Sequence, residues 1–150
     1  MARWSQYGLL LALLTGCGGS APPAKNLPAT VPVTGIVKMD GKPLSHTSVT
    51  FVPTGNTKGV ECVGAADEEG KFSLTQLRGS TGCPPGEYRV ILNRYVKPGG
   101  QPVALNTGEA PADAGAIESL PPKYSGMESQ LVVTVPPSGG EIPIEIKGGK

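Results

Sequence analysis

Short runs in which every second residue is hydrophobic recur along this chain, and Gly- and Pro-rich segments separate them. The runs are Val33–Met39, Ser48–Val52, Val60–Ala65, Lys71–Leu77, Glu87–Tyr95, Gln130–Val135 and Glu141–Lys147. Alternation with a period of two places one face of a strand in the core and the other face in water. The 150 residues include 22 Gly and 16 Pro, which suit frequent turns. The pattern therefore predicts an all-β domain whose two sheets pack face to face as a β-sandwich.

Two positions in these runs carry more specific expectations. Pro143 cannot donate a ladder hydrogen bond, so we expect the last run to lie at a sheet edge. Tyr88 alternates inward with Val90 and Leu92, and we expect a core or corner tyrosine whose hydroxyl binds a backbone partner. A ligand-stacking role for Tyr88 is the alternative.

The N-terminus has the parts of a secretory signal. Arg3 supplies a positive charge, an apolar run ends at Leu14, and the small residues Thr15 and Gly16 follow. The apolar run is much shorter than the roughly 20 residues that span a bilayer. The sequence from Leu14 to Cys17 resembles a bacterial lipobox, which implies cleavage before Cys17 and attachment of lipid to its sulfur. A plain secretory signal with a chance cysteine is the alternative.

These features predict three parts of the chain. Residues 1–16 are expected to be a lipoprotein signal peptide, residues 17–31 the lipidated cysteine and a flexible Gly/Pro/Ala-rich tether, and residues 32–148 the β-sandwich. We therefore expect an exported protein of the cell envelope, held on the outer or the cytoplasmic membrane by lipid on Cys17.

Cys62 and Cys83 are the cysteines that remain after Cys17. An exported compartment permits a disulfide between them, which is the pairing we favour. Two buried free thiols are the alternative, because cysteine also packs as a small hydrophobic residue.

The segment 97–119 shows no alternation and is rich in Pro, Gly, Ala and acidic residues. A loop of this length is usually disordered or functional. Its composition predicts a mobile loop, and an ordered binding loop is the alternative.

Tyr124 follows two prolines, which either display its ring for recognition or let it pack over one end of the sandwich; we favour packing. Lys123 and Tyr124 are the candidate interaction surface.

Several motifs, taken in order, resemble one family. They are Val33–Val37, the turn Asp40–Leu44, Val49–Pro53, Asp67–Leu74, Pro85–Val90, Leu120–Tyr124 and Leu131–Val135. Their order is similar to that of carboxypeptidase regulatory-like domains, which are transthyretin-like, as carried by small bacterial lipoproteins. The resemblance covers about residues 31–147 and implies a seven-stranded Greek-key β-sandwich. It implies no peptidase activity, because the catalytic residues of metallocarboxypeptidases belong to a separate domain.

Charge and residue chemistry narrow the function classes. Without residues 1–16 the chain has 12 basic and 12 acidic side chains, so no basic surface is available to recruit nucleic acid. His46 has no partner motif for a metal site or a catalytic triad. Asp67, Glu68 and Glu69 lack EF-hand spacing and fit a hairpin turn better than a Ca²⁺ site. We therefore expect no cofactor, no metal and no enzymatic activity.

The expected function is accordingly that of a non-catalytic, lipid-anchored β-sandwich in the cell envelope, acting as a protein-interaction or structural module. A glycan- or small-ligand-binding module at the cell surface is the alternative. The expected partners are membrane lipid through Cys17 and an envelope protein or glycan of unknown identity, and nucleic acid is not among them.

Overall fold

The computed structural model describes residues 26–105 and 110–149, so the expected signal peptide, Cys17 and the tether up to residue 25 lie outside the described residues. In the described part the chain forms strands and no helix, and hence no helix that could cross a membrane. The strands are β1 (Val33–Met39), β2 (Lys42–Pro43), β3 (Ser48–Pro53), β4 (Cys62–Ala65), β5 (Lys71–Ser73), β6 (Thr75–Gln76), β7 (Gly86–Asn93), β8 (Tyr95–Val96), β9 (Ile117–Glu118), β10 (Val132–Val135), β11 (Gly140–Glu141) and β12 (Ile144–Ile146).

The first sheet is built around β1. On one side β11 and β12 pair with β1 in parallel, and on the other side β5 and β2 pair with it antiparallel. Val33 pairs with Gly140 and Val37 pairs with Ile144, so β11 and β12 share one register and form a single edge interrupted at Pro143. The expected edge position of Pro143 is confirmed.

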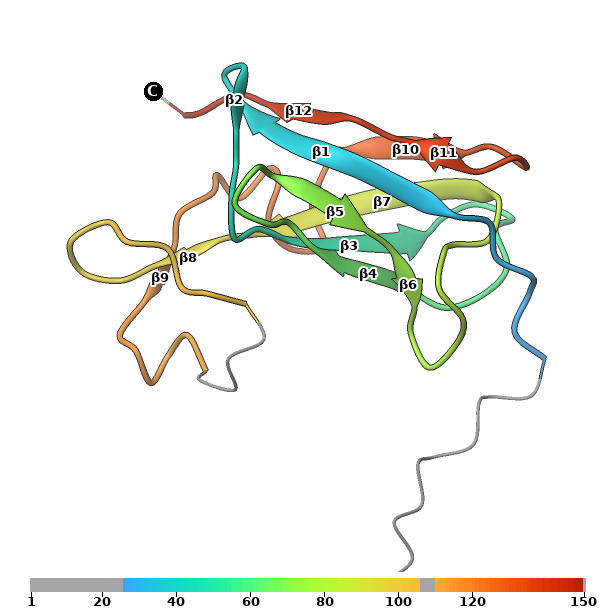
Figure 1. Cartoon of the computed structure of the whole chain (residues 1–150), viewed down its shortest axis with the longest axis horizontal. Coiled ribbons are helices and arrows are strands. Elements are labelled where there is room, and N and C mark those ends of the chain that lie inside the picture. The colour runs from blue at the N-terminus through green and yellow to red at the C-terminus, as the bar shows by residue number, and fades with distance from the viewer. Residues whose placement is uncertain (1–25, 106–109, 150) are drawn as a thin grey trace, which may run out of the picture.

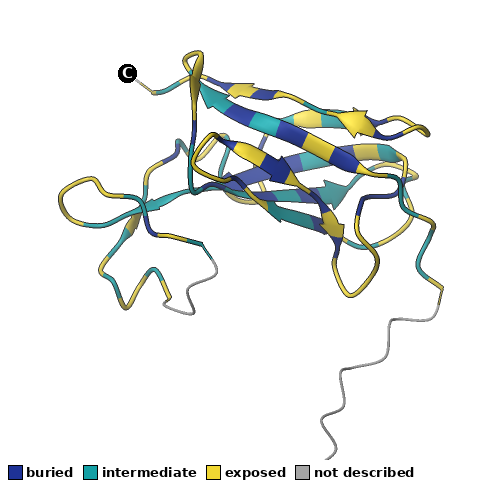
Figure 2. Ribbon diagram, viewed as in Figure 1, coloured by how far each residue is buried: buried dark blue, intermediate teal, exposed yellow. Residues whose placement is uncertain are grey.

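The second sheet has the strand order β10-β7-β3-β4-β6, with every neighbouring pair antiparallel. Its longest ladder joins β3 and β7 from Ser48 opposite Asn93 to Pro53 opposite Tyr88. The two sheets lie one above the other in Figure 1, and buried residues alternate with exposed ones along their strands in Figure 2. The chain is therefore all-β with a β-sandwich-like arrangement, as the alternation predicts.

The core lies between the sheets and comes from the alternating positions of both. Its buried residues are Val33, Val37, Leu44, Val49, Phe51, Cys62, Ala66, Phe72, Leu74, Cys83, Tyr88, Val90, Leu92, Leu120, Val135, Ile144 and Ile146. The Phe51 ring lies at its centre, with centroids 5.8 Å from Tyr88 and 6.4 Å from Phe72. The Tyr88 hydroxyl donates a hydrogen bond of 2.8 Å to the Pro84 carbonyl oxygen, which confirms the expected corner tyrosine.

Several predicted strands have different limits in the structure, and the differences are largest in two of them. The run Lys71–Leu77 is divided into β5 and β6, and Leu77 lies in a loop with 43% of its surface exposed. Tyr95, expected at the end of the fifth strand, belongs to the separate strand β8. β8 pairs with β9 to form a two-stranded ribbon that the sequence pattern does not predict.

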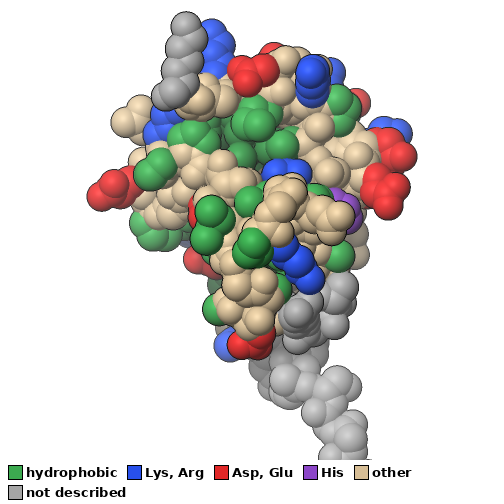
Figure 3. All heavy atoms as spheres, turned by 90° about the vertical axis from the view of Figure 1, so that its left-hand side faces the viewer, with side chains coloured by type: hydrophobic (Ala, Val, Ile, Leu, Met, Phe, Trp, Pro, Cys, Tyr) green, Lys and Arg blue, Asp and Glu red, His purple; other side chains and the backbone are tan. Residues whose placement is uncertain are grey.

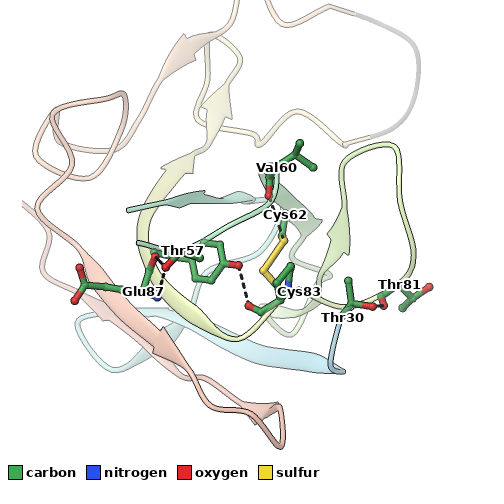
Figure 4. The surroundings of a disulfide bond; sticks show 9 residues. Thr30, Thr57, Val60, Cys62, Thr81, Cys83 and Glu87 are labelled. Carbon is green, nitrogen blue, oxygen red and sulfur yellow. Dashed lines mark hydrogen bonds between the residues drawn. A yellow bond between two sulfur atoms is a disulfide. The ribbon is translucent and has the colours of Figure 1, made fainter. Parts of the chain in front are cut away.

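Residues 27–31, expected at the end of the tether, belong to the domain instead. Val31 exchanges two backbone hydrogen bonds with Cys83, at 2.9 and 3.0 Å. The Thr30 hydroxyl donates to the Thr81 carbonyl oxygen at 2.8 Å, as Figure 4 shows. The end of the segment expected as a tether is thus paired with the sandwich through Thr30 and Val31.

Cys62 and Cys83 are joined by a disulfide whose two cysteines are fully buried and whose Cα atoms are 5.8 Å apart (Figure 4). Cys62 begins β4, and Cys83 lies three residues before β7. The neighbouring Gly82 has a φ of 99°, and a Cβ there would lie 2.3 Å from the Val31 carbonyl oxygen. The disulfide and this glycine together hold residues 27–31 against the second sheet.

We predict that replacing both cysteines by alanine lowers the free energy of unfolding by about 3 kcal/mol, because the disulfide no longer restrains a loop of about 22 residues in the unfolded chain. Urea unfolding of the oxidised protein and of the Cys62→Ala/Cys83→Ala variant measures this difference. Equal unfolding midpoints and slopes for the two proteins would contradict the prediction.

Candidate functional site

The predicted site residues that the structure describes lie at two opposite ends of the sandwich. Cys17 lies outside the described residues. The disulfide lies at the end that carries residues 27–31, on the right in Figure 1, which we call the proximal end. β8 and β9 lie at the other end, on the left, and Lys123–Tyr124 lies beside the end of β7 that leads to them. We call this the distal end.

Tyr124 is half-buried and packs against the core, which confirms the packing interpretation. Its hydroxyl accepts a hydrogen bond of 3.2 Å from the Lys147 N–H, and the Lys123 ammonium lies 4.9 Å from the centroid of its ring. The Lys147 hydrogen bond first, and the Lys123 charge after it, lower the pKa of Tyr124 below its usual value. One ring face and the hydroxyl are thus occupied within the chain, and Lys123 is the more exposed member of the pair.

The β8–β9 ribbon is fixed to the sandwich by the carboxylate of Glu118. One oxygen accepts the N–H groups of Arg94 and Leu120 at 3.0 and 2.9 Å, and the other accepts the Asn93 amide at 2.9 Å. Charged acceptors make stronger hydrogen bonds than neutral ones. Glu118 is therefore the residue that holds the base of the ribbon, and the sequence offered no signal for this role.

Arg94 reinforces the same junction from the other side. Its Nε donates to the Ser45 carbonyl oxygen at 3.0 Å, so it ties the ribbon to the loop before β3. The Ser119 N–H and hydroxyl both donate to the Arg94 carbonyl oxygen, at 2.8 and 2.7 Å. The polar side chains gathered here are thus engaged in holding backbone.

Most of the expected loop 97–119 has a defined course. A turn from Lys97 to Gly100 and a bridge between Val96 and Pro102 return the chain toward the sandwich, where Val103 is 4% exposed. Leu105 then lines a shallow groove on the outer face of the second sheet, together with residues of β3 and β4. Residues 106–109 lie outside the described part, and the mobility of this loop stays a prediction.

Exposed apolar side chains mark the distal end and the nearby outer surface. Ile117 is 69% exposed on β9, Met127 is 62% exposed in the loop before β10, and Val132 is 57% exposed on β10. Figure 3 looks at the distal end: hydrophobic and uncharged atoms make up most of its surface, and charged side chains lie around its rim, with some Lys or Arg atoms also near its middle. Such a surface resembles the composition of a protein interface more than that of a highly charged binding site.

The proximal end carries a groove of about 640 Å³. Its lining comes from Pro28–Ala29, the loop Thr54–Lys58 and Pro84–Glu87. The Thr57 hydroxyl donates to the Glu87 carbonyl oxygen at 3.0 Å and accepts the Glu87 N–H at 2.8 Å. The Thr57 hydroxyl in the groove is therefore already bonded within the chain.

The residues considered for metal or catalytic chemistry lie apart. Within residues 26–105 and 110–149 the structure brings together no group of three His, Cys, Asp or Glu side chains that could hold a metal ion. His46 lies in the loop between β2 and β3 with a φ of 52°. One Asp67 carboxylate oxygen accepts the Glu69 and Lys71 N–H groups, as in a hairpin turn.

Comparison of the chain with models of protein families, with curated proteins and with solved structures finds no match.

Replacing Glu118 by alanine is predicted to loosen the ribbon and to lower the free energy of unfolding by about 2 kcal/mol, because two N–H groups lose a charged acceptor. Glu118→Gln is the matched control, since its amide oxygen still accepts one or two of these bonds. Amide hydrogen exchange should accelerate at Arg94 and Leu120 in the alanine variant. Unchanged exchange at both amides would show that the carboxylate does not hold the ribbon.

The tyrosines are predicted to ionise in a fixed order as pH rises. Burial raises the pKa of Tyr88 above 10.0, whereas the pKa of Tyr124 is lowered. Neutral Tyr88 therefore stabilises the fold fully below about pH 10, the pKa of an unfolded tyrosine, and this contribution is lost as pH rises above that value. Ultraviolet difference titration of the wild type and of Tyr88→Phe and Tyr124→Phe variants assigns the steps; ionisation of Tyr88 before Tyr124 in the folded protein would contradict the order.

Proposed function

We propose that this chain is a non-catalytic, lipid-anchored β-sandwich of the cell envelope that acts by binding another envelope protein through its distal end. The lipobox-like sequence ending at Cys17 supports export and anchoring by lipid. The order of hairpins and turns supports membership of the transthyretin-like, carboxypeptidase regulatory-like domains and a seven-stranded Greek-key topology.

One observation carries this proposal: the N-terminal segment and the β8–β9 ribbon lie at opposite ends of the sandwich. The segment that continues toward Cys17 is fixed to the proximal end by the pairing of Val31 with Cys83. The β8–β9 ribbon, with exposed Ile117, lies at the other end (Figure 1). A chain anchored through Cys17 therefore presents the ribbon on the side away from the attachment point, where a partner can reach it.

The hydrogen bonds made by the charged side chains at the base of the ribbon support a non-catalytic role. The charged side chains of Glu118 and Arg94 converge at the base of the ribbon. They make hydrogen bonds to backbone groups, and Glu118 also binds the Asn93 amide. A catalytic acid, base or nucleophile instead needs a group directed at a substrate. We therefore assign these residues to positioning the ribbon.

A glycan- or small-ligand-binding module is the second candidate, and the proximal groove is the observation that favours it. Its volume of about 640 Å³ lies in the range of small-molecule sites. The groove includes Lys58 and Asn56 as polar groups, but its Thr57 hydroxyl is bonded to Glu87. A ligand there would sit at the end of the domain that faces the anchor.

Photo-crosslinking in intact cells tests the proposal. A benzophenone side chain at Ile117 should capture one envelope protein, identified by mass spectrometry, and the same group at Asn56 on the proximal end should not capture it. Capture should be lost in Cys17→Ser, which cannot be anchored. Equal products from both positions, or products that contain only wall glycan, would overturn the protein-binding proposal.

A further inference from the structure

Two loops flank the point at which the N-terminal segment leaves the proximal end. A Cβ on Gly79 would lie 3.0 Å from Cδ1 of Leu27, and a Cβ on Gly59 would lie 3.0 Å from Cγ of Pro28. The loop from 77 to 83 also receives the Thr30 hydroxyl at Thr81 (Figure 4). The N-terminal segment therefore leaves the domain between these two loops.

The side chains next to these contacts have a distinctive combination of properties. Leu77 exposes 43% of its surface at the start of one loop, and Arg78 follows it, exposed and with a φ of 60°. Lys58 is exposed on the other loop, directly before Gly59. An arginine rarely adopts positive φ, so the turn directs Leu77 and Arg78 outward at some conformational cost.

An exposed leucine beside two cations suits the surface of an anionic membrane. Apolar side chains enter the boundary between headgroups and acyl chains, while Lys and Arg remain with the headgroups. One acidic residue, Glu61, is joined to the same loop through its backbone, because its carbonyl oxygen accepts the Leu77 N–H at 2.8 Å.

The length of chain before the domain makes this contact geometrically accessible. Nine residue steps separate Cys17 from Asn26. A fully extended chain spans at most about 3.6 Å per residue, so these steps reach about 32 Å at most. The eight residues of β7 extend about 26 Å, so the tether is about as long as the sandwich. A lipid on Cys17 thus keeps the proximal loops within one domain length of the bilayer.

We propose that Leu77, Arg78 and Lys58 form a membrane contact at the proximal end, with Leu77 in the headgroup boundary and the two cations on anionic headgroups of the leaflet that holds Cys17. This inference deepens the proposed function, on which it rests for the anchor. The contact orients the domain so that the β8–β9 ribbon points away from the membrane. Each cation near an anionic surface strengthens the contact by about fivefold.

Tryptophan fluorescence tests the contact directly, because Trp4 is the only tryptophan of the sequence and precedes Cys17. The chain from residue 17 carries Leu77→Trp and is coupled through the Cys17 thiol to a maleimide lipid in vesicles that contain phosphatidylglycerol and brominated phosphatidylcholine. Cys62 and Cys83 remain in their disulfide, so Cys17 is the only thiol available for coupling. Ile117→Trp, at the exposed distal site, is the matched control.

The expected result is a blue-shifted emission of Trp at position 77 that brominated lipid quenches by about half, with little quenching at position 117. Lys58→Gln/Arg78→Asn in the Leu77→Trp protein should abolish the quenching, as should 1 M salt, which shortens the screening length to about 3 Å. Asparagine tolerates positive φ, so this variant removes charge while keeping the turn. Circular dichroism before coupling confirms that each variant is folded.

Equal quenching at positions 77 and 117, or quenching at position 77 that survives both charge removal and salt, would overturn the membrane contact. Because the lipid is attached chemically, this outcome is independent of whether cells acylate Cys17. A protein that shows the contact on vesicles but is not lipidated in cells would instead contradict the proposed anchor.

Discussion

Cys83 joins three parts of the chain that are distant in sequence, and the orientation of the domain depends on it. Its sulfur is bonded to Cys62 at the start of β4, and its backbone exchanges two hydrogen bonds with Val31. Three residues later the chain enters β7, the strand between β10 and β3. The N-terminal segment is therefore attached rigidly to the second sheet, and it leaves the sandwich at one defined end.

The opposite end is held by a different kind of interaction. There the Glu118 carboxylate binds backbone and amide N–H groups, and Arg94 reaches the loop before β3. These hydrogen bonds let a two-stranded ribbon, which is marginal in isolation, project from the sandwich with Ile117 exposed. A disulfide thus stabilises the proximal end, where the N-terminal segment is attached, and the hydrogen bonds of Glu118 stabilise the distal end, where the ribbon is exposed.

The alternation of hydrophobic residues predicted the two-layered strand arrangement because burial determines which face of each strand points inward. Val49, Phe51, Tyr88 and Leu92 are all fully buried as expected. The same pattern was misleading at Leu77, which continues the alternation but lies exposed in a loop.

Other features of the structure cannot be predicted from the local sequence pattern, because they depend on contacts between segments that are distant in sequence. The Val31–Cys83 pairing joins residues 52 apart, and the Glu118 network depends on a carboxylate in a segment without alternation. Composition alone therefore assigned residues 27–31 to the tether and segment 97–119 to a mobile loop. Lys123 and Tyr124 were selected from a proline context, and the structure adds that they contact each other and that the Tyr124 hydroxyl binds the Lys147 N–H.

The proposed orientation requires that the chain begin at a lipidated Cys17, and the intact mass of the protein extracted from its native membrane tests this most directly. The account predicts a protein whose first residue is Cys17, with the disulfide formed and with the added mass of a diacylglyceryl group, with or without a third acyl chain. A chain that begins at any other residue, or one that begins at Cys17 without lipid, would contradict it.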